Sequence, residues 1–370
     1  MPMLALMYCS PLLYLMFANV ITSIDWASIL LMLSIGVTGL TNPEEFRIST
    51  VLYSCMFVTM FLAYTKFITN SGLTAQNIKK LCVNIIYAYA IIQIIQQIGV
   101  LTDSYVLNGS YNIGIGNLLK VNDFTAEASQ TGRVITAIAY GFIKSEEIIL
   151  GVDKISLKYL WKNYKKLCLA FLYISFGTAS VACAFGCFVL MLYFIERKHI
   201  IQGVLTISIA FVLFLYMETE LSIRIRTFLM AVWEFDARSL FLIDPSSAAR
   251  VGPYMLYAEE FDISNYNVWL GYGCDYGGIH AYSIMSDVDV EKNMGVGGII
   301  NSLYDYGLIF LFAFLFFVIR VVGVKGYELF LFLIIFSTSA FNMHTLWIFF
   351  IIVYTIRYLK EESNKTLQLC

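Results

Sequence analysis

Four arginines fall within one polar stretch of an otherwise apolar chain. The stretch covers about residues 218–304 and contains Arg224, Arg226, Arg238 and Arg250. The planar guanidinium of arginine forms two parallel charge-assisted bonds to a phosphate and stays ionised at any working pH. Three or more arginines that converge at a membrane surface would therefore suit a diphosphate. The plainer alternative is that they are solvated side chains paired with Glu218, Glu220, Glu234 or Asp236.

The secondary structure around Arg224 and Arg226 decides whether they can act together. They flank Ile225, so on a strand both would face the same side. On a helix they would point about 200° apart. Arg250 follows after the turn signals Pro245-Ser246-Ser247, and we expect a helix over 248–261.

A second polar segment, 123–133, contains Glu127 and Arg133 six residues apart. Charged side chains near a membrane interface are expensive to bury unless they are paired or used. Glu127 is a candidate general base, or a group that holds an arginine in place, and Arg133 is a further candidate phosphate ligand. The alternative is an ordinary helix start, with Thr125 as the cap and Glu127 in the first turn.

Histidine and glycine positions complete the candidate chemistry. His344 stands at the outer end of the last apolar hairpin and can act as a base near neutral pH, although a structural histidine at the interface fits it as well. His280, within the large polar stretch, allows the same two readings. Gly271 and Gly273 predict a tight turn or a close backbone approach. They do not follow a strand with a nucleotide-binding pattern, so a dinucleotide site is rejected.

Composition assigns these residues to a membrane protein. Of the 370 residues 59% are hydrophobic and 14% are charged, against about 25% charged in soluble domains. The net charge of −2 argues against general nucleic-acid binding. The eight cysteines form no disulfide framework and the three histidines are too scattered for a metal motif, so we expect neither a metal nor another cofactor.

Ten apolar runs approach or reach the length that crosses a bilayer, about 17–25 residues. They are 3–22, 24–40, 50–68, 81–101, 131–149, 167–195, 199–217, 307–323, 327–342 and 344–358. The first is longer than the apolar core of a cleaved signal, so we expect it to span. Basic residues mark cytoplasmic loops. They cluster at 79–80, 144–166, 197–198 and 357–360.

The basic clusters at 144–166 and 197–198 should both be cytoplasmic, yet only one apolar run, 167–195, joins them. A single crossing would place them on opposite sides of the membrane. A break near Gly177-Thr178-Ala179-Ser180 into two short or re-entrant helices would return the chain to the cytoplasm. The sequence thus predicts one all-α polytopic domain over 1–370, with about 11 transmembrane helices in a range of about 10–12. A smaller loop, 102–130, and a large loop, 218–305, would then face outward. We also expect a helix over 293–306 that leads into the next span.

The order of four motifs resembles the O-antigen polymerase (Wzy) family, within the wider O-antigen polymerase and ligase group. Residues 124–129 resemble the family's F-x-E-P-S element, with Ala128 in place of proline. The small-residue break at 175–184 has a counterpart in the family. Ser247-x-x-Arg250 followed by Gly271-Tyr272-Gly273 resembles the main periplasmic loop. Asn293 followed by Tyr304-Asp305-Tyr306-Gly307-Leu308 resembles the lead into the next span. The resemblance in order and spacing covers about 120–325, over half of the chain.

The resemblance implies a GT-C-type glycosyltransferase of the bacterial inner membrane, with its active site facing the periplasm. Such an enzyme works without metal or nucleotide sugar. It transfers the growing glycan of an O-antigen or capsule from undecaprenyl diphosphate to the next lipid-linked repeat unit. Arg250 with Arg224 or Arg226, and also Arg133, would stabilise the departing diphosphate, and Glu127 or His344 would serve as the base. A chain-length-determining protein is an implied partner.

Two alternatives remain. The related ligase transfers glycan to the lipid A core and typically carries a loop histidine next to an asparagine. Here Lys292-Asn293 occupies that place and His280 lies 13 residues earlier. A flippase or other transporter usually shows repeats and short loops, whereas this chain has no visible repeat and one dominant loop.

Overall fold

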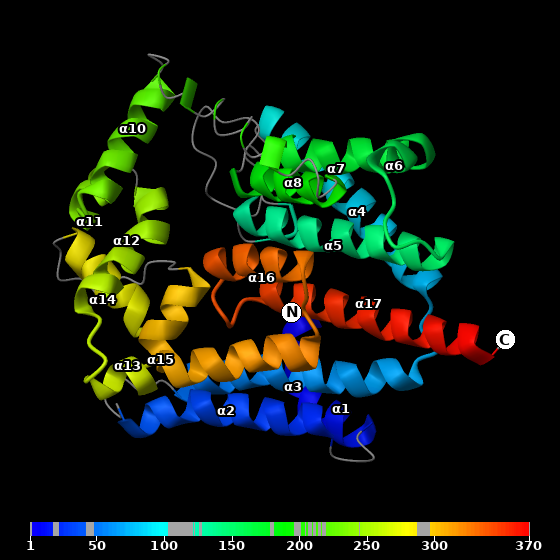
Figure 1. Ribbon diagram of the computed structural model, residues 1–370, viewed down its shortest axis with the longest axis horizontal. Coiled ribbons are helices and arrows are strands. Elements are labelled where there is room, and N and C mark those ends of the chain that lie inside the picture. The colour runs from blue at the N-terminus through cyan, green and yellow to red at the C-terminus, as the bar shows by residue number, and fades with distance from the viewer. Residues whose placement is uncertain are drawn as a thin grey trace. The chain divides into compact units, whose positions relative to one another are not determined.

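The chain is all-helical wherever the computed structural model describes it (Figure 1). The described residues are 2–17, 22–41, 48–102, 121, 123–125, 128–177, 181–195, 201–203, 205, 209, 212–213, 216, 220–243, 245–286 and 297–369. They divide into two compact units. Unit 1 comprises Met1–Lys66, Glu196–Val321 and Phe332–Leu346, and unit 2 comprises Phe67–Ile195, Val322–Leu331 and Trp347–Cys370.

Unit 1 contains both apolar helices and the helices of the polar stretch. Its elements are α1 (Pro2–Phe17), α2 (Ser23–Thr41), most of α3 (Ile48–Asn70), α10 (Glu220–Trp233), α11 (Ala237–Ile243), α12 (Pro245–Glu260), α13 (Tyr266–Leu270), α14 (Tyr276–Ser286), α15 (Gly298–Phe317) and most of the π-helical turn η3 (Val318–Val322). Helix α2 runs along α15.

Unit 2 is a bundle in which α4 and α8 pack against α5. Its elements are α4 (Ala75–Leu101), α5 (Ala128–Leu150), α6 (Leu157–Asn163), α7 (Lys165–Gly177) and α8 (Val181–Phe194). Helix α7 contacts α4, α5 and α8. Helices α16 (Tyr327–Thr338) and α17 (His344–Leu369) contribute residues to both units.

Three helical stretches are long and apolar enough to cross a membrane: Ile48–Asn70, Ala75–Leu101 and Gly298–Val322. Shorter apolar helices cover Tyr8–Phe17, Ser23–Thr38 and Tyr327–Thr338. The fold is consistent with the expected helical membrane protein. The count of about 11 crossings and the GT-C architecture stay predictions. The run at 199–217 lies largely outside the described residues.

The long apolar run 167–195 forms two helices, as its small-residue break predicts. Helix α7 ends at Gly177 and α8 begins at Val181. Two glutamines of α4 satisfy carbonyl groups near the end of α7, because Gln93 Nε2 donates to the Tyr173 carbonyl at 3.4 Å and Gln97 Nε2 donates to the Gly177 carbonyl at 3.0 Å. Irregular backbone at membrane depth is tolerated where protein groups satisfy it in this way.

The large polar stretch folds as a layer of short helices on the first half of α15. Its core has two clusters. One joins α11, α12, α14 and α15 through Ala237, Leu256, Tyr257, Ala281, Met285, Ile300 and Tyr304. The other joins α10, α11 and α12 through Ala231, Leu240, Ala248 and Met255. Figure 1 shows α13 and α14 near the amino-terminal end of α15 and α10 farther from it. The predicted helix over 248–261 is confirmed as α12.

Candidate functional site

The turn between α13 and α14 lies across the first half of α15. The Tyr272 amide donates to the Tyr304 carbonyl at 2.7 Å, and the Gly273 amide donates to the Asp305 carbonyl at 3.4 Å. These carbonyls are available because α15 is interrupted at Gly307, which has φ 76° and ψ −176°. The two glycine-bearing motifs that sequence analysis placed in separate elements are therefore bonded to each other.

Close backbone approach explains the glycines in both motifs. A Cβ on Gly271 would lie 2.7 Å from the Tyr306 Cα, and a Cβ on Gly307 would lie 2.5 Å from the Gly271 nitrogen. Gly271 also has φ 86° and Gly273 has φ 131°, in the region that favours glycine. The tight-turn interpretation of Gly271 and Gly273 is confirmed.

Asp305 anchors α14 to α15 from inside. Its side chain is 2% exposed. It accepts hydrogen bonds from the Gly277 amide at 3.0 Å and from Asn301 Nδ2 at 2.7 Å. The first of these bonds satisfies an amide in the first turn of α14, which otherwise has no partner within the helix. Asp305 thus has a structural role beneath the surface that α14 presents.

On that surface, Glu260 at the end of α12 joins α14 and α15. Its Oε1 lies 2.8 Å from His280 Nε2 on α14. Its Oε2 accepts a hydrogen bond from the Tyr304 hydroxyl on α15 at 3.0 Å. The other imidazole nitrogen, His280 Nδ1, lies 3.3 Å from the Tyr276 hydroxyl. One carboxylate therefore fixes both a histidine and a tyrosine.

Aromatic rings surround this carboxylate–histidine pair. Tyr272 stacks on Tyr276 with centroids 4.9 Å apart, and Tyr276 stacks on His280 at the same separation. Tyr304 meets His280 edge-on at 5.6 Å. Tyr276 and His280 stack because a spacing of four places side chains above one another on α14, whereas Tyr272 joins the row from the turn that precedes this helix.

The pair is open to solvent on one side. The side chains of Glu260 and His280 are 36% and 21% exposed. Burial raises the pKa of Glu260, but the hydrogen bonds from His280 and Tyr304 outweigh it and hold that pKa below its ordinary value. The carboxylate is therefore ionised near neutral pH and can orient the imidazole ring.

This arrangement can move a proton and hold a ring-shaped polar ligand. A carboxylate hydrogen-bonded to one imidazole nitrogen fixes the tautomer and leaves the other nitrogen as the proton acceptor. Stacked aromatic faces beside it offer apolar area with polar hydroxyl groups at the rim. Among the residues that the structure describes, no three His, Cys, Asp or Glu side chains gather as a metal site.

The predicted arginines are only partly described. Arg224 and Arg226 lie on α10, and the helical alternative holds, so their positions are about 200° apart around its axis. Arg226 is half-buried, whereas the side chains of Arg224 and Arg250 lie outside the description. Arg250 is on α12, the same helix as Glu260, about 15 Å from it along an ideal axis.

The other predicted site residues are distributed between the two units. Glu127 and Asn293 lie outside the described residues. Arg133 is half-buried on α5 in unit 2, and His344 is half-buried as the first residue of α17 in unit 1. Asp236 caps α11 by accepting bonds from the Arg238 and Ser239 amides, at 3.1 and 3.0 Å, instead of serving only as a surface counter-ion.

Sequence reasoning missed Glu260, Tyr276 and Tyr304, and did not choose between the two readings of His280. One signal was present in the composition: seven of the 25 tyrosines lie between 254 and 304. A segment that is polar and yet rich in tyrosine is typical of a binding surface, because the ring supplies contact area and the hydroxyl supplies hydrogen bonds. No known protein family, curated protein or solved structure matches this chain.

Proposed function

We propose that this chain is a membrane glycosyltransferase that polymerises lipid-diphosphate-linked oligosaccharide repeats of an O-antigen or capsule. The observation that carries the proposal is the Glu260 carboxylate, which holds His280 at 2.8 Å beside a row of stacked tyrosines. The order of motifs from 124 to 308 supplies the reaction class, and the geometry supplies the acid–base group that such a transfer needs.

In this proposal His280 activates the acceptor sugar. The acceptor hydroxyl takes the position that the Tyr276 hydroxyl occupies near His280 Nδ1, and its proton passes to that nitrogen. Its oxygen forms a bond to the anomeric carbon of the donor, while the bond from that carbon to the diphosphate oxygen breaks. Glu260 touches only protein groups here, so it acts by orienting the imidazole and stabilising the imidazolium.

The departing diphosphate needs positive charge. Arg250 is the first candidate, because it shares α12 with Glu260 and follows the family-like Ser247-x-x-Arg pattern. One of Arg224 and Arg226 joins it, since two residues two positions apart on α10 cannot face the same point. Arg133 as a phosphate ligand, and Glu127 or His344 as alternative bases, belong to the same proposal.

The remaining features of the proposal follow from the family resemblance. The donor and acceptor are carried on undecaprenyl diphosphate, and the protein has a GT-C-like architecture and needs no metal or other cofactor. It acts in the inner membrane with the 218–305 layer facing the periplasm. A chain-length-determining protein is the proposed partner. Fixing two lipid-anchored substrates in one cavity would supply much of the remaining rate enhancement.

The direct test is turnover by the full-length chain in detergent or vesicles with a synthetic lipid-diphosphate-linked repeat unit. We expect products of two or more repeats, released lipid diphosphate, and no effect of a chelator. Arg250→Ala should abolish elongation at an unchanged protein level. Long chains formed by Arg250→Ala would remove this arginine from the mechanism, and a wild-type protein that forms no product would overturn the proposal.

The ligase is a second candidate because His280 is an oriented loop histidine, but it lies 13 residues before Asn293 instead of next to it, which makes the ligase the weaker candidate. The same assay separates the two activities when the lipid A core is offered beside the lipid-linked repeat. A ligase would modify the core and leave the repeats unextended. A flippase would do neither, and would instead move fluorescent lipid-linked oligosaccharide across the vesicle membrane.

A further inference from the structure

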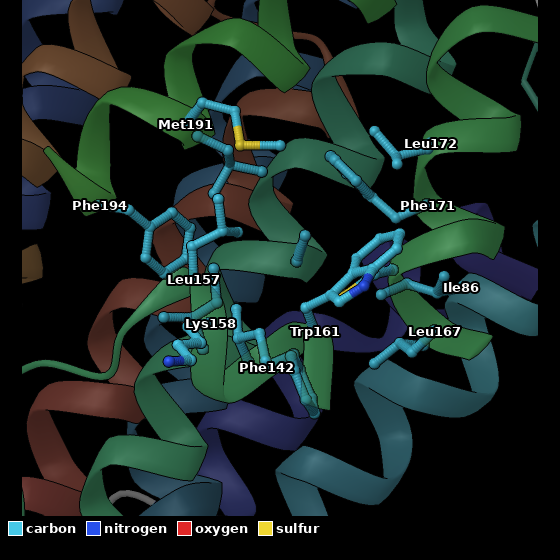
Figure 2. Close-up of a pocket in the computed structure, with 15 residues that line it drawn as sticks. Ile86, Phe142, Leu157, Lys158, Trp161, Leu167, Phe171, Leu172, Met191 and Phe194 are labelled. Atoms are coloured by element: carbon cyan, nitrogen blue, oxygen red, sulfur yellow. The ribbon is translucent and has the colours of Figure 1, made fainter. Parts of the chain in front are cut away.

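Unit 2 contains an apolar cavity that the proposed glycan chemistry does not use. Its volume is about 520 Å³, and helices α4, α5, α6, α7 and α8 contribute its walls. The lining includes Ile86, Phe142, Leu157, Trp161, Phe171 and Met191. Figure 2 shows Trp161 next to Leu167 and Phe171, and Lys158 on the side of Leu157 and Phe142. Lys158 is the charged member of the lining.

Helix α6 is fixed over this cavity by a buried carboxylate. Tyr159 on α6 donates to Glu146 Oε1 at 2.8 Å, and Tyr164 at the end of α6 donates to the same oxygen at 2.6 Å. Glu146 Oε2 pairs with Lys79 at 2.7 Å. The neighbouring Glu147 pairs with Lys144 at 2.6 Å. Glu146 and Glu147 are therefore each paired with a lysine of α4 or α5. Neither carboxylate neutralises the lysines on and next to α6.

The segment that contains α6 is strongly basic. Five exposed lysines lie between residues 154 and 166, against one aspartate, Asp153. They are Lys154, Lys158, Lys162, Lys165 and Lys166. Two apolar side chains of α6 are also exposed, with Leu157 at 41% and Trp161 at 45%. A short helix that presents lysines together with leucine and tryptophan is typical of the boundary between lipid headgroups and acyl chains.

We propose that this cavity binds an anionic phospholipid, with an acyl chain between α4 and α8 and its negative headgroup at Lys158. An apolar wall does not select one lipid tail over another, because tails are as apolar as the lining. The charge of Lys158 makes the selection. Dense lysines mark the cytoplasmic side, where anionic lipids give the surface its negative potential. The lipid-linked donor would instead be consumed at the opposite side.

Trp161 lines the cavity and provides a fluorescent reporter of its occupancy. The full-length protein is reconstituted in phosphatidylcholine vesicles with a small fraction of lipid brominated on the acyl chain, either phosphatidylglycerol or phosphatidylcholine with identical chains. The fluorescence decrease that brominated lipid causes in the wild type is compared with the decrease in Trp161→Phe. The difference between the two is the quenching of Trp161. We expect brominated phosphatidylglycerol to quench at a mole fraction about 5-fold or more below that of brominated phosphatidylcholine.

Lys158→Gln tests the headgroup assignment without disturbing the core, since this lysine is exposed. It should reduce the preference for the anionic lipid by about fivefold, whereas Lys365→Gln, an exposed lysine outside the cavity, should leave it unchanged. Equal quenching by the two brominated lipids, or a preference that Lys158→Gln preserves, would overturn the proposal. Unbrominated lipids can also be added as competitors that relieve the quenching. If polyprenyl phosphate relieves it at a lower concentration than phosphatidylglycerol does, the proposal is overturned and the cavity is assigned to the lipid chain of a substrate.

Discussion

The backbones of Gly271 and Gly307 are in direct contact, and neither residue has room for a side chain. A Cβ on Gly307 would lie 2.5 Å from the Gly271 nitrogen, and both residues have positive φ angles, 86° and 76°. The contact interrupts α15 and exposes the carbonyls of Tyr304 and Asp305 to the turn before α14. Two glycine-bearing segments more than thirty residues apart therefore form one structural joint beneath the Glu260–His280 pair.

Substitution of either glycine by alanine should destabilise this joint. At Gly307 the backbone conformation itself is nearly restricted to glycine, and the backbone of Trp269 and Gly271 would have to move. We expect Gly307→Ala and Gly271→Ala each to cost about 2–4 kcal/mol and to lower the melting temperature of the purified protein. Gly36→Ala is the matched control, because that helical glycine has open space around it. Equal melting temperatures for all three variants would contradict the account.

Apolar length and turn chemistry made part of this fold predictable. The break in 167–195, the helix over 248–261 and the turn at 271–273 each depend on local signals: small residues, a proline-serine start and glycine spacing. Local signals of this kind act within one or two helical turns. The structure places all three where those signals predict them.

The Glu260 site was not predictable in the same way. Its members come from α12, α14 and α15, and only the packing of these helices brings Glu260 within 2.8 Å of His280, twenty residues away. Arginine attracted attention because its chemistry is distinctive, whereas a glutamate at the end of a helix looks like an ordinary solvated residue. A tertiary contact of this kind leaves no spacing pattern in a single sequence.

Loss of the Glu260 carboxylate should impair chemistry more than folding. His280→Asn should lower kcat about 10²–10⁴-fold, the range for a lost general base, with little change in KM. Glu260→Gln removes the carboxylate that orients the imidazole and should lower kcat by a similar factor. The double variant should be no worse than about the worse single one, because residues that act as a unit are not additive. Glu259→Gln, at the exposed neighbour, is the control. An additive double variant would indicate two independent structural roles.

Tyr276 separates the stacking contribution from the hydroxyl contribution. Tyr276→Phe keeps the ring that stacks on Tyr272 and His280 but removes the hydroxyl near His280 Nδ1. Because the stacking surface is unchanged, KM for the acceptor should equal that of the wild type. Tyr276→Ala removes the platform, and KM for the acceptor should rise about 2- to 10-fold. Tyr266→Ala, at a tyrosine that is 57% exposed, should behave like the wild type. If Tyr276→Phe and Tyr276→Ala raise KM equally, ring stacking does not contribute to binding of the acceptor.

Asp123 should make the stability of the protein depend on pH. Burial raises its pKa to about 7, although the Thr131 hydroxyl opposes the rise, and Gln96 holds its backbone through bonds of 2.8 and 3.0 Å. The folded state therefore keeps a proton that the unfolded chain loses above its ordinary pKa of 3.8. It follows that stability falls as pH rises from about 4 to 7, and that the cost is complete above pH 7.

Asp123→Asn removes this titration and suits the local backbone, since φ of 53° is tolerated by asparagine. One pKa unit corresponds to about 1.4 kcal/mol, so the variant should gain about 1–4 kcal/mol at pH 8 and little near pH 4. Melting temperatures across that range give the measurement, with Asp153→Asn as the exposed control. A variant that is no more stable than the wild type at pH 8 would show that Asp123 does not carry this cost.

The break between α7 and α8 determines which way the large helical layer faces. If the two helices enter and leave on the same side, residues 163 and 198 are both cytoplasmic and residue 264 is outside. The α4 glutamines support such a return, because Gln97 caps the end of α7 at the Gly177 carbonyl. Reporters active on only one side of the membrane, fused at these three positions, should agree with this assignment. A reporter at 198 that is active only outside would make 167–195 a simple crossing, and would turn the Glu260 site away from the proposed periplasmic substrate.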